Sequence, residues 1–120
     1  MPYYLQTTPF VVPTADGKFI AEHEGLASTG NKNISIAQMV APPQWGEPFQ
    51  TPRFDEYTLV SRGKKMVEVE GEQIILNAGE SILIKSGTRV RYSNPFDDPC
   101  EYWSICMPAF SIETVNREEA

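Results

Sequence analysis

The segment Gly79-Glu80-Ser81-Ile82-Leu83-Ile84-Lys85-Ser86-Gly87-Thr88-Arg89-Val90-Arg91-Tyr92-Ser93-Asn94 decides the fold of this 120-residue chain. It contains two short runs of β-branched, aliphatic and aromatic residues, at 81–84 and 90–92, on either side of a connection that contains Gly87. Runs of this length, bounded by turn-forming residues, indicate two β-strands.

Short strands of the same kind are predicted along most of the chain. They cover residues 10–12, 19–21, 34–40, 57–60, 66–70, 73–76 and 102–107. Asp16-Gly17 is a turn signal, 70–72 is predicted to be the turn of a hairpin, and the proline-rich stretch 41–48 a loop at the rim. Helical periodicity is absent, although residues 111–120 are compatible with a short polar helix. We therefore expect one all-β domain, closed as a barrel or double-stranded jelly roll that hides its sheet edges.

The charge balance bears on the partners of the chain. Sixteen acidic and ten basic side chains give a formal net charge of −6, which repels phosphate backbones and anionic membrane surfaces. No apolar run approaches the roughly 20 residues that span a bilayer, and the first residues lack the features of a secretory signal. We expect no nucleic-acid or membrane partner and, by default, a cytoplasmic location.

The two cysteines, Cys100 and Cys106, are predicted to lie on one extended segment. Six residues of strand separate them by about 20 Å, which is beyond the reach of a disulfide. We expect free thiols in a reducing compartment that fill the core rather than act as nucleophiles.

The segment quoted above resembles the second sequence motif of the cupin superfamily, Gly-x5-Pro-x-Gly-x2-His-x3-Asn. Gly79, Gly87 and Asn94 keep the register of that motif. Lys85 stands in place of the proline, and Val90 in place of the histidine that would bind metal.

The first cupin motif is also recognisable upstream, at its Glu-x6-Gly end. Glu56 and Gly63 match it, whereas the preceding His-x-His is absent. Depending on the spacing, those two positions hold either Gln50 and Pro52 or Phe49 and Thr51.

The resemblance covers about residues 34–108 and implies a single cupin domain over residues 1–120. The strands within residues 8–24 would then pack on the barrel or on a dimer partner, and residues 111–120 would form a polar tail. Because cupins commonly pair through such strands, we expect a homodimer.

Among cupins, the chain is most similar to the ethanolamine-utilisation cupin. The similarity lies in Phe54-Asp55-Glu56, in the non-histidine Val90 and in a closing strand that ends at Met107-Pro108. That family is described as metal-independent and has been assigned acetate kinase activity. The sequence has no Walker-type loop, and no basic phosphate cradle is expected on the pocket face, so a kinase activity ranks low.

The residues themselves argue against a metal cofactor. A transition ion in a cupin pocket needs about three imidazoles and a carboxylate, and of these only Glu56 remains. His23, the only histidine, lies outside both motifs between two glutamates and is expected on a solvated strand or loop. We expect neither a metal nor another cofactor.

Strand alternation predicts which side chains face the pocket. On the first-motif strand, Thr58 and Val60 share the inward face of Glu56. On the second-motif strand, Thr88 and Tyr92 share the inward face of Val90. The closing strand allows two sets, of which we favour the first because it leaves bulky apolar residues for sheet packing: Tyr102, Ser104 and Cys106, or Glu101, Trp103 and Ile105.

These residues suggest two functions for the pocket. In the first, the chain is a metal-independent isomerase, lyase or cyclase in which Glu56 moves a proton. The residues expected to bind its substrate are Gln50, Thr58, Tyr92, Tyr102 and Cys106, with Arg53 as a clamp for an anion at the rim. In the second, the same pocket binds a sugar or a small polar metabolite without catalysis.

Each candidate residue also has a purely structural interpretation. Glu56 would then be a surface carboxylate, the tyrosines would fill the core, and Arg53 would pair with Asp55. A pocket filled by side chains is the third possibility.

Overall fold

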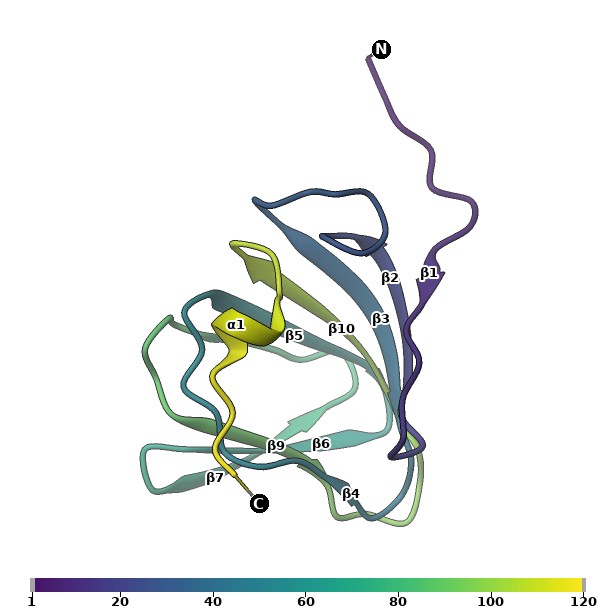
Figure 1. The fold of residues 1–120 in the computed structure, drawn as a ribbon. Helices are drawn as coiled ribbons and strands as arrows, with labels where there is room; N and C mark the ends of the chain where they lie inside the picture. The colour runs from purple at the N-terminus through teal and green to yellow at the C-terminus, as the bar shows by residue number, and fades with distance from the viewer. Residues whose placement is uncertain (1, 120) are drawn as a thin grey trace.

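The computed structural model describes residues 2–119 and consists of two antiparallel sheets that face each other (Figure 1). One sheet has the order β1-β2-β3-β10-β5-β8, and the other has the order β4-β9-β6-β7. Within this range the strands are β1 (Phe10–Val11), β2 (Phe19–Glu24), β3 (Ser35–Ala41), β4 (Trp45–Gly46), β5 (Asp55–Arg62), β6 (Lys64–Val69), β7 (Glu72–Asn77), β8 (Ser81–Ile84), β9 (Val90–Asn94) and β10 (Cys100–Met107). The prediction of an all-β jelly roll is confirmed.

The hairpin of β6 and β7 forms as the sequence predicts. Its two-residue turn, Glu70-Gly71, has positive φ at both positions, 51° and 76°. This is the geometry that matches the twist of an antiparallel pair. The strands then pair in register from Val69↔Glu72 to Lys64↔Asn77.

Gly63 carries the chain from one sheet to the other. β5 belongs to the six-stranded sheet and β6 to the four-stranded sheet, with only Gly63 between them. Gly63 has φ of 80°, and a Cβ atom there would lie 2.4 Å from the carbonyl oxygen of Pro99. Because only glycine satisfies both conditions, this position allows Glu56 and Lys65, nearby in sequence, to come from facing sheets.

The N-terminal strands pack on the barrel of their own chain. β2 pairs with β3 from Phe19↔Val40 onward, and β1 pairs with β2 at the edge of the sheet. The turn between them is fastened to the opposite sheet, where Trp45 Nε1 donates to Asp16 Oδ2 at 2.7 Å. Residues 2–5 extend away from the barrel (Figure 1).

Of residues 111–120, which are compatible with a short polar helix, only one turn is helical, and Ala120 lies outside the described residues. α1 (Ile112–Val115) is capped by Ser111 and ends at Asn116, whose left-handed backbone has φ of 52°. The chain then turns back along the barrel, where Glu118 N donates to Phe49 O at 2.8 Å. Among residues 2–119, no helix is long and apolar enough to cross a membrane.

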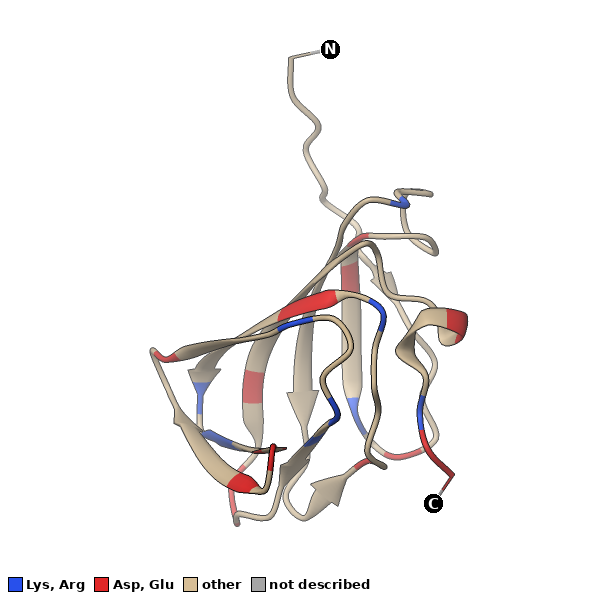
Figure 2. Ribbon diagram, turned by 90° about the vertical axis from the view of Figure 1, so that its left-hand side faces the viewer, with Lys and Arg blue, Asp and Glu red and all other residues tan. Residues whose placement is uncertain are grey.

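The core lies between the inner faces of the two sheets. Fully buried residues such as Val60, Val67 and Val90 pack there. Cys100 and Cys106 are both buried free thiols, as predicted. Acidic and basic positions are interspersed along the strands and loops (Figure 2).

Candidate functional site

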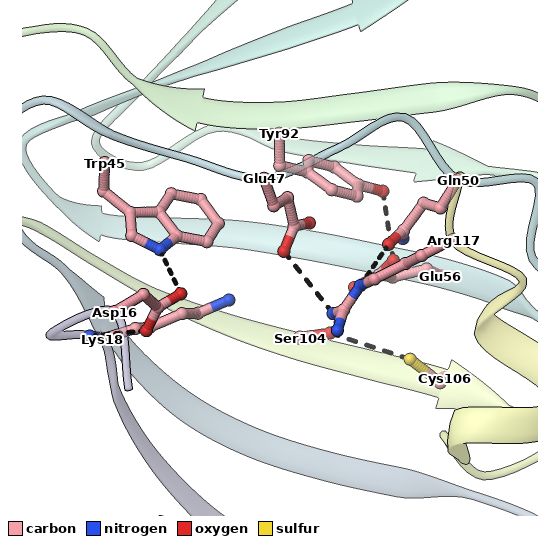
Figure 3. Close-up of polar contacts among 10 residues, drawn as sticks. All are labelled: Asp16, Lys18, Trp45, Glu47, Gln50, Glu56, Tyr92, Ser104, Cys106 and Arg117. Carbon is pink, nitrogen blue, oxygen red and sulfur yellow. Dashed lines mark hydrogen bonds and ion pairs between the residues drawn. The ribbon is translucent and has the colours of Figure 1, made fainter. Parts of the chain in front are cut away.

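A cavity of about 100 Å³ lies between the two sheets at one end of the core. It receives side chains from both sheets, from the loop before β5 and from the C-terminal tail (Figure 3). Its polar lining residues are Lys18, Glu22, Ser35, Glu47, Gln50, Glu56, Lys65, Tyr92, Tyr102, Ser104, Cys106 and Arg117.

A larger hollow, of about 700 Å³, lies on the outer surface beside the β6–β7 turn. It is bordered by exposed residues such as Glu70, Glu72 and Arg89. Of the two, the cavity between the sheets has the character of a ligand site, because buried polar groups converge on it.

Glu56 is the carboxylate of the inner cavity, and donors from both sheets hold it. Its Oε1 accepts a hydrogen bond from the hydroxyl of Tyr92 on β9 at 3.1 Å. Its Oε2 accepts from the hydroxyl of Ser104 on β10 at 2.5 Å. The structure therefore brings Glu56 and Tyr92 together, and the two donors fix the carboxylate with part of its hydrogen-bonding capacity still free.

The closing strand, β10, places Tyr102, Ser104 and Cys106 inward. These three residues are buried and line the cavity, whereas Glu101, Trp103 and Ile105 alternate with them on the other face. The hydroxyl of Tyr102 is buried and has no hydrogen-bond partner in the described part of the chain. Burial raises the pKa of Tyr92 and Tyr102 well above the usual value, so both phenols stay protonated and can donate.

Gln50 is positioned by the strand that carries the second motif. Its backbone forms two hydrogen bonds with Val90, at 2.9 and 2.8 Å, and its side chain is buried in the cavity wall. Its Oε1 accepts a hydrogen bond from Arg117 Nε at 3.4 Å. Gln50 therefore links the wall of the cavity to the C-terminal tail.

Two of the predicted binding residues lie outside the cavity. Arg53 is exposed in the bend before β5, where its backbone N donates to Thr114 O, and its side chain is not part of the lining. Thr58 shares the inward face with Glu56 but is 0% exposed and enclosed by the packed sheets. Both predictions are corrected here. Neither the path of the bend nor the place where the sheets close together follows from strand alternation alone.

The sequence predicts no basic phosphate cradle on the pocket face, but three basic side chains line the cavity. Lys18, Lys65 and Arg117 all line the cavity. Lys65, on β6, is 2% exposed, and its Nζ lies 3.4 Å from the ring centroid of Tyr102 and 4.4 Å from that of Tyr92.

Lys18 approaches the same aromatic cluster from the β1–β2 connection. Its Nζ lies 4.5 Å from the ring centroid of Trp45 and 5.4 Å from that of Tyr102. No hydrogen bond or ion pair within residues 2–119 engages the ammonium group of Lys18 or of Lys65. The cation–π contacts are their only polar partners in that range.

Arg117 reaches the mouth of the cavity from the C-terminal tail. Its Nη2 lies 3.5 Å from Glu47 Oε2, and its side chain remains 44% exposed. Lys65 had a signal in the sequence, since it alternates with Val67 on the inward face of β6. Lys18 and Arg117 had none, because a turn and a tail bring them to the site.

The two lysines lie in an environment that disfavours their charged form. Burial, together with the charge of Lys18, lowers the pKa of Lys65 to about 7. Burial also lowers the pKa of Lys18, against the favourable charges of Glu47 and Glu56. Near neutral pH, Lys65 therefore exists in both its neutral and its charged form.

The metal site typical of cupins does not fit these residues. Val90 is buried in the core, and His23 packs against Trp103 on the outer side of the six-stranded sheet, with ring centroids 5.2 Å apart. No group of three or more His, Cys, Asp and Glu side chains within the described residues is arranged to hold an ion. A cation would also meet the positive charges of Lys18 and Arg117.

Comparison with known proteins gives the chain a family. Residues 37–106 match the family described as "Cupin domain". The chain is also 44% identical over 108 residues to a protein named endoribonuclease YbeY from Myxococcus xanthus; the alignment covers 90% of this chain but only 37% of that protein.

Solved structures show the same architecture at low sequence identity. An RmlC-like cupin from Shewanella frigidimarina superposes with a TM-score of 0.73 at 14% identity, over 91% of this chain and 92% of that one. KdgF from a Halomonas species gives 0.74 at 13% identity, over 92% and 96% of the two chains.

An ethanolamine utilization protein Q from Salmonella typhimurium gives a TM-score of 0.60 at 19% identity, over 78% of this chain and 71% of that one. These likenesses are to the fold. The family match covers more than half of the chain and coincides with the barrel, and the chain therefore belongs to the cupin family.

Proposed function

We propose that the barrel pocket binds a small metabolite that carries a carboxylate. The main support for this proposal is the environment of Lys65. Its side chain is buried at the cavity, and its ammonium group has no hydrogen bond or ion pair within residues 2–119. Buried polar groups are normally paired, so such a group marks the place of a missing partner. The unpartnered hydroxyl of Tyr102 and the cation of Lys18 support the same conclusion.

The size of the cavity limits the ligand. Pockets for drug-sized molecules measure about 300–1,000 Å³, whereas this one measures about 100 Å³. A water molecule occupies about 30 Å³ in the liquid, so the cavity suits a ligand of only a few non-hydrogen atoms. This space admits an acetate-sized anion but not a nucleotide, and an acetate-kinase activity therefore still ranks low despite the three basic residues.

We further propose that the pocket acts on this ligand without a metal, with Glu56 as the proton donor or acceptor. Tyr92 and Ser104 hold the carboxylate of Glu56 in place, and this carboxylate lines the same cavity as the basic residues. The alternative is a module that binds a small polar metabolite without catalysis; a sugar, which the sequence also suggests, is larger than the few non-hydrogen atoms that the cavity admits. The lining of the cavity suits both functions.

Calorimetric titration with acetate, glycolate and lactate tests the binding proposal. Lys65→Met is expected to weaken binding at least about tenfold, because it removes a desolvated charge partner of the anion. Lys64→Met is the matched control, since Lys64 is the exposed neighbour on the same strand. Equal affinities of the two variants would exclude the pocket as an anion site.

Glu56→Gln separates catalysis from simple binding. If Glu56 transfers protons, the variant loses exchange of ligand C–H protons with solvent deuterium, as measured by NMR, while it still binds the ligand. If the C–H protons of the ligand exchange equally fast with both proteins, or do not exchange with the unaltered chain, the non-catalytic alternative is favoured.

The Myxococcus relative raises endoribonuclease activity as a second candidate. The chain spans only 37% of that protein, and most of the cupin match lies in the aligned part. We infer that the activity named for the relative belongs to its remainder, and we expect this chain alone not to cleave RNA. Cleavage of a fluorescent RNA that disappears in Glu56→Gln would reverse this inference.

A further inference from the structure

Lys65 offers a chemistry beyond holding an anion. We propose that Lys65 is a nucleophile that forms an imine with the carbonyl carbon of a small 2-oxo acid held in the pocket. This inference rests on the proposed function, because it needs the carboxylate of the ligand to be bound at the same site.

Burial sets Lys65 apart, since it is 2% exposed and is the only fully buried lysine in the described part of the chain. Its amine lies at the cavity wall, 3.4 Å from the ring centroid of Tyr102 and 4.4 Å from that of Tyr92, and no carboxylate within residues 2–119 pairs with it. A buried lysine without an ion-pair partner, close to a second cation, is a common arrangement for a nucleophilic amine. Lys18 provides the second cation, since its Nζ lies against the same Tyr102 ring.

The protonation state is suitable for nucleophilic attack. Burial and the charge of Lys18 lower the pKa of Lys65 to about 7, so a large share of the amine is neutral at physiological pH. An exposed lysine near its ordinary value of about 10.4 is almost entirely protonated there.

The other cavity residues match the remaining groups of a 2-oxo acid. When Lys65 is neutral and attacks, Lys18 and Arg117 are the cations that remain for the carboxylate, and the hydroxyl of Tyr102 is a free donor for the carbonyl oxygen. Tyr92 contacts both Glu56 and Lys65. Its hydroxyl donates a hydrogen bond to Glu56, and its ring faces the amine of Lys65. The cavity volume of about 100 Å³ suits acids of the size of glyoxylate and pyruvate.

The reaction is balanced with the residues present. The neutral Nζ attacks the carbonyl carbon and forms the N–C bond, and the C–O bond then breaks. The oxygen leaves as water after it takes one proton from Nζ and one proton from solvent that Glu56 relays. The iminium ion keeps the other Nζ proton and the positive charge, and no oxidant or reductant is needed.

Reductive trapping tests the proposal on the full chain. The protein is incubated with pyruvate and sodium cyanoborohydride, and its peptides are mapped by mass spectrometry. We expect one carboxyethyl group on Lys65, near-complete labelling, protection by excess acetate and little labelling of the exposed Lys64. Because this map uses the unaltered chain, it does not depend on the folding of a variant.

Variants and an analogue distinguish the possible failures. Lys65→Met is expected to abolish the adduct, and Lys64→Met to leave it unchanged. No adduct, an adduct that persists in Lys65→Met, or equal labelling of Lys64 and Lys65 overturns the proposal. Lactate has a carboxylate but no ketone carbonyl. If lactate binds and its binding depends on Lys65 while pyruvate is not trapped, only the imine is wrong; if neither binds, the proposed function fails as well.

Discussion

At the scale of single residues, Lys65 makes the stability of the fold depend on pH. An unfolded lysine holds its proton up to about pH 10.4, whereas burial lowers the pKa of folded Lys65 to about 7. Between these values the unfolded chain binds more protons, so the free energy of unfolding rises with pH. Below about pH 7 both states are protonated, and the cost of burying the charge is present in full.

The resulting prediction concerns urea unfolding between pH 7 and pH 9. For the unaltered chain, the free energy of unfolding is expected to rise by up to about 1.4 kcal/mol per pH unit from this one group. Lys65→Met is expected to remove most of this rise, and Lys64→Met to retain it. A flat pH profile in the unaltered chain would contradict the assigned environment of Lys65.

Gly63 gives a second prediction at this scale. Gly63→Ala is expected to lower the free energy of unfolding by at least about 2 kcal/mol, because it combines positive φ with contact against the Pro99 carbonyl. Gly71→Ala is the control: Gly71 has a similar φ of 76° but open space around its Cβ position. Thermal or urea unfolding that shows equal losses would mean that the contact with Pro99 contributes nothing.

The residues of the site differ in how far the sequence predicts them. Glu56 and Tyr92 are both predicted to face the pocket, and strand alternation suffices for that because it fixes the face on which each side chain lies. Lys18 and Arg117 are brought to the cavity by a turn and a tail, whose paths depend on tertiary contacts. Strand alternation also fails for Thr58, but in another way: its side chain lies on the predicted inward face and is nevertheless outside the cavity.

At the scale of elements, the C-terminal tail completes the cavity. The left-handed Asn116 ends α1, and the backbone of Arg117 then pairs with Gln50. The tail is held further by Arg89, whose Nε and Nη2 donate to Glu118 at 2.6 and 2.9 Å. The sequence predicts only a polar tail here. Its composition indicates neither the left-handed turn nor the pairing of the tail with Gln50.

Arg117→Ala tests the contribution of the tail. We expect the affinity for small carboxylates to fall about tenfold, because a cation at the mouth is lost. The free energy of unfolding is expected to change by less than about 0.5 kcal/mol, since the Arg117–Glu47 pair is partly exposed. Arg62→Ala is the control for net charge, as Arg62 is 82% exposed and pairs with Glu101; equal affinities of the two variants would exclude a role for Arg117.

At the scale of the whole molecule, the outer face of the six-stranded sheet is unusually apolar. Tyr57 and Leu59 on β5 are 39% and 43% exposed, and their partners across the strands include Leu83 and Trp103. Contiguous exposed apolar residues of this kind are typical of a contact between subunits. We propose that this face, rather than the N-terminal strands, forms the contact of the homodimer that the sequence leads us to expect.

Light scattering coupled to gel filtration checks this assembly. At micromolar concentration, the protein is expected to elute with twice the chain mass of 13.5 kDa. Leu59→Lys is expected to shift it to the monomer, and Leu26→Lys, at an exposed leucine in the loop after β2, is expected not to do so. A monomer in the unaltered protein would exclude the dimer.

The overall architecture is the part that the sequence predicts best. The glycines and the alternating strands specify a jelly roll, because each element carries its own local signal. The cavity depends instead on where the β1–β2 connection, the loop before β5 and the C-terminal tail meet the two sheets (Figure 3).

The opposite placement of the two ends matters for every experiment above. Residues 2–5 point away from the barrel (Figure 1), whereas Arg117 borders the mouth of the cavity. An affinity tag at the C-terminal end would follow Arg117 by only a few residues, and a polyhistidine tag there would bring imidazoles close to a cavity whose described residues do not form a metal site. Purification handles therefore belong at the N-terminal end.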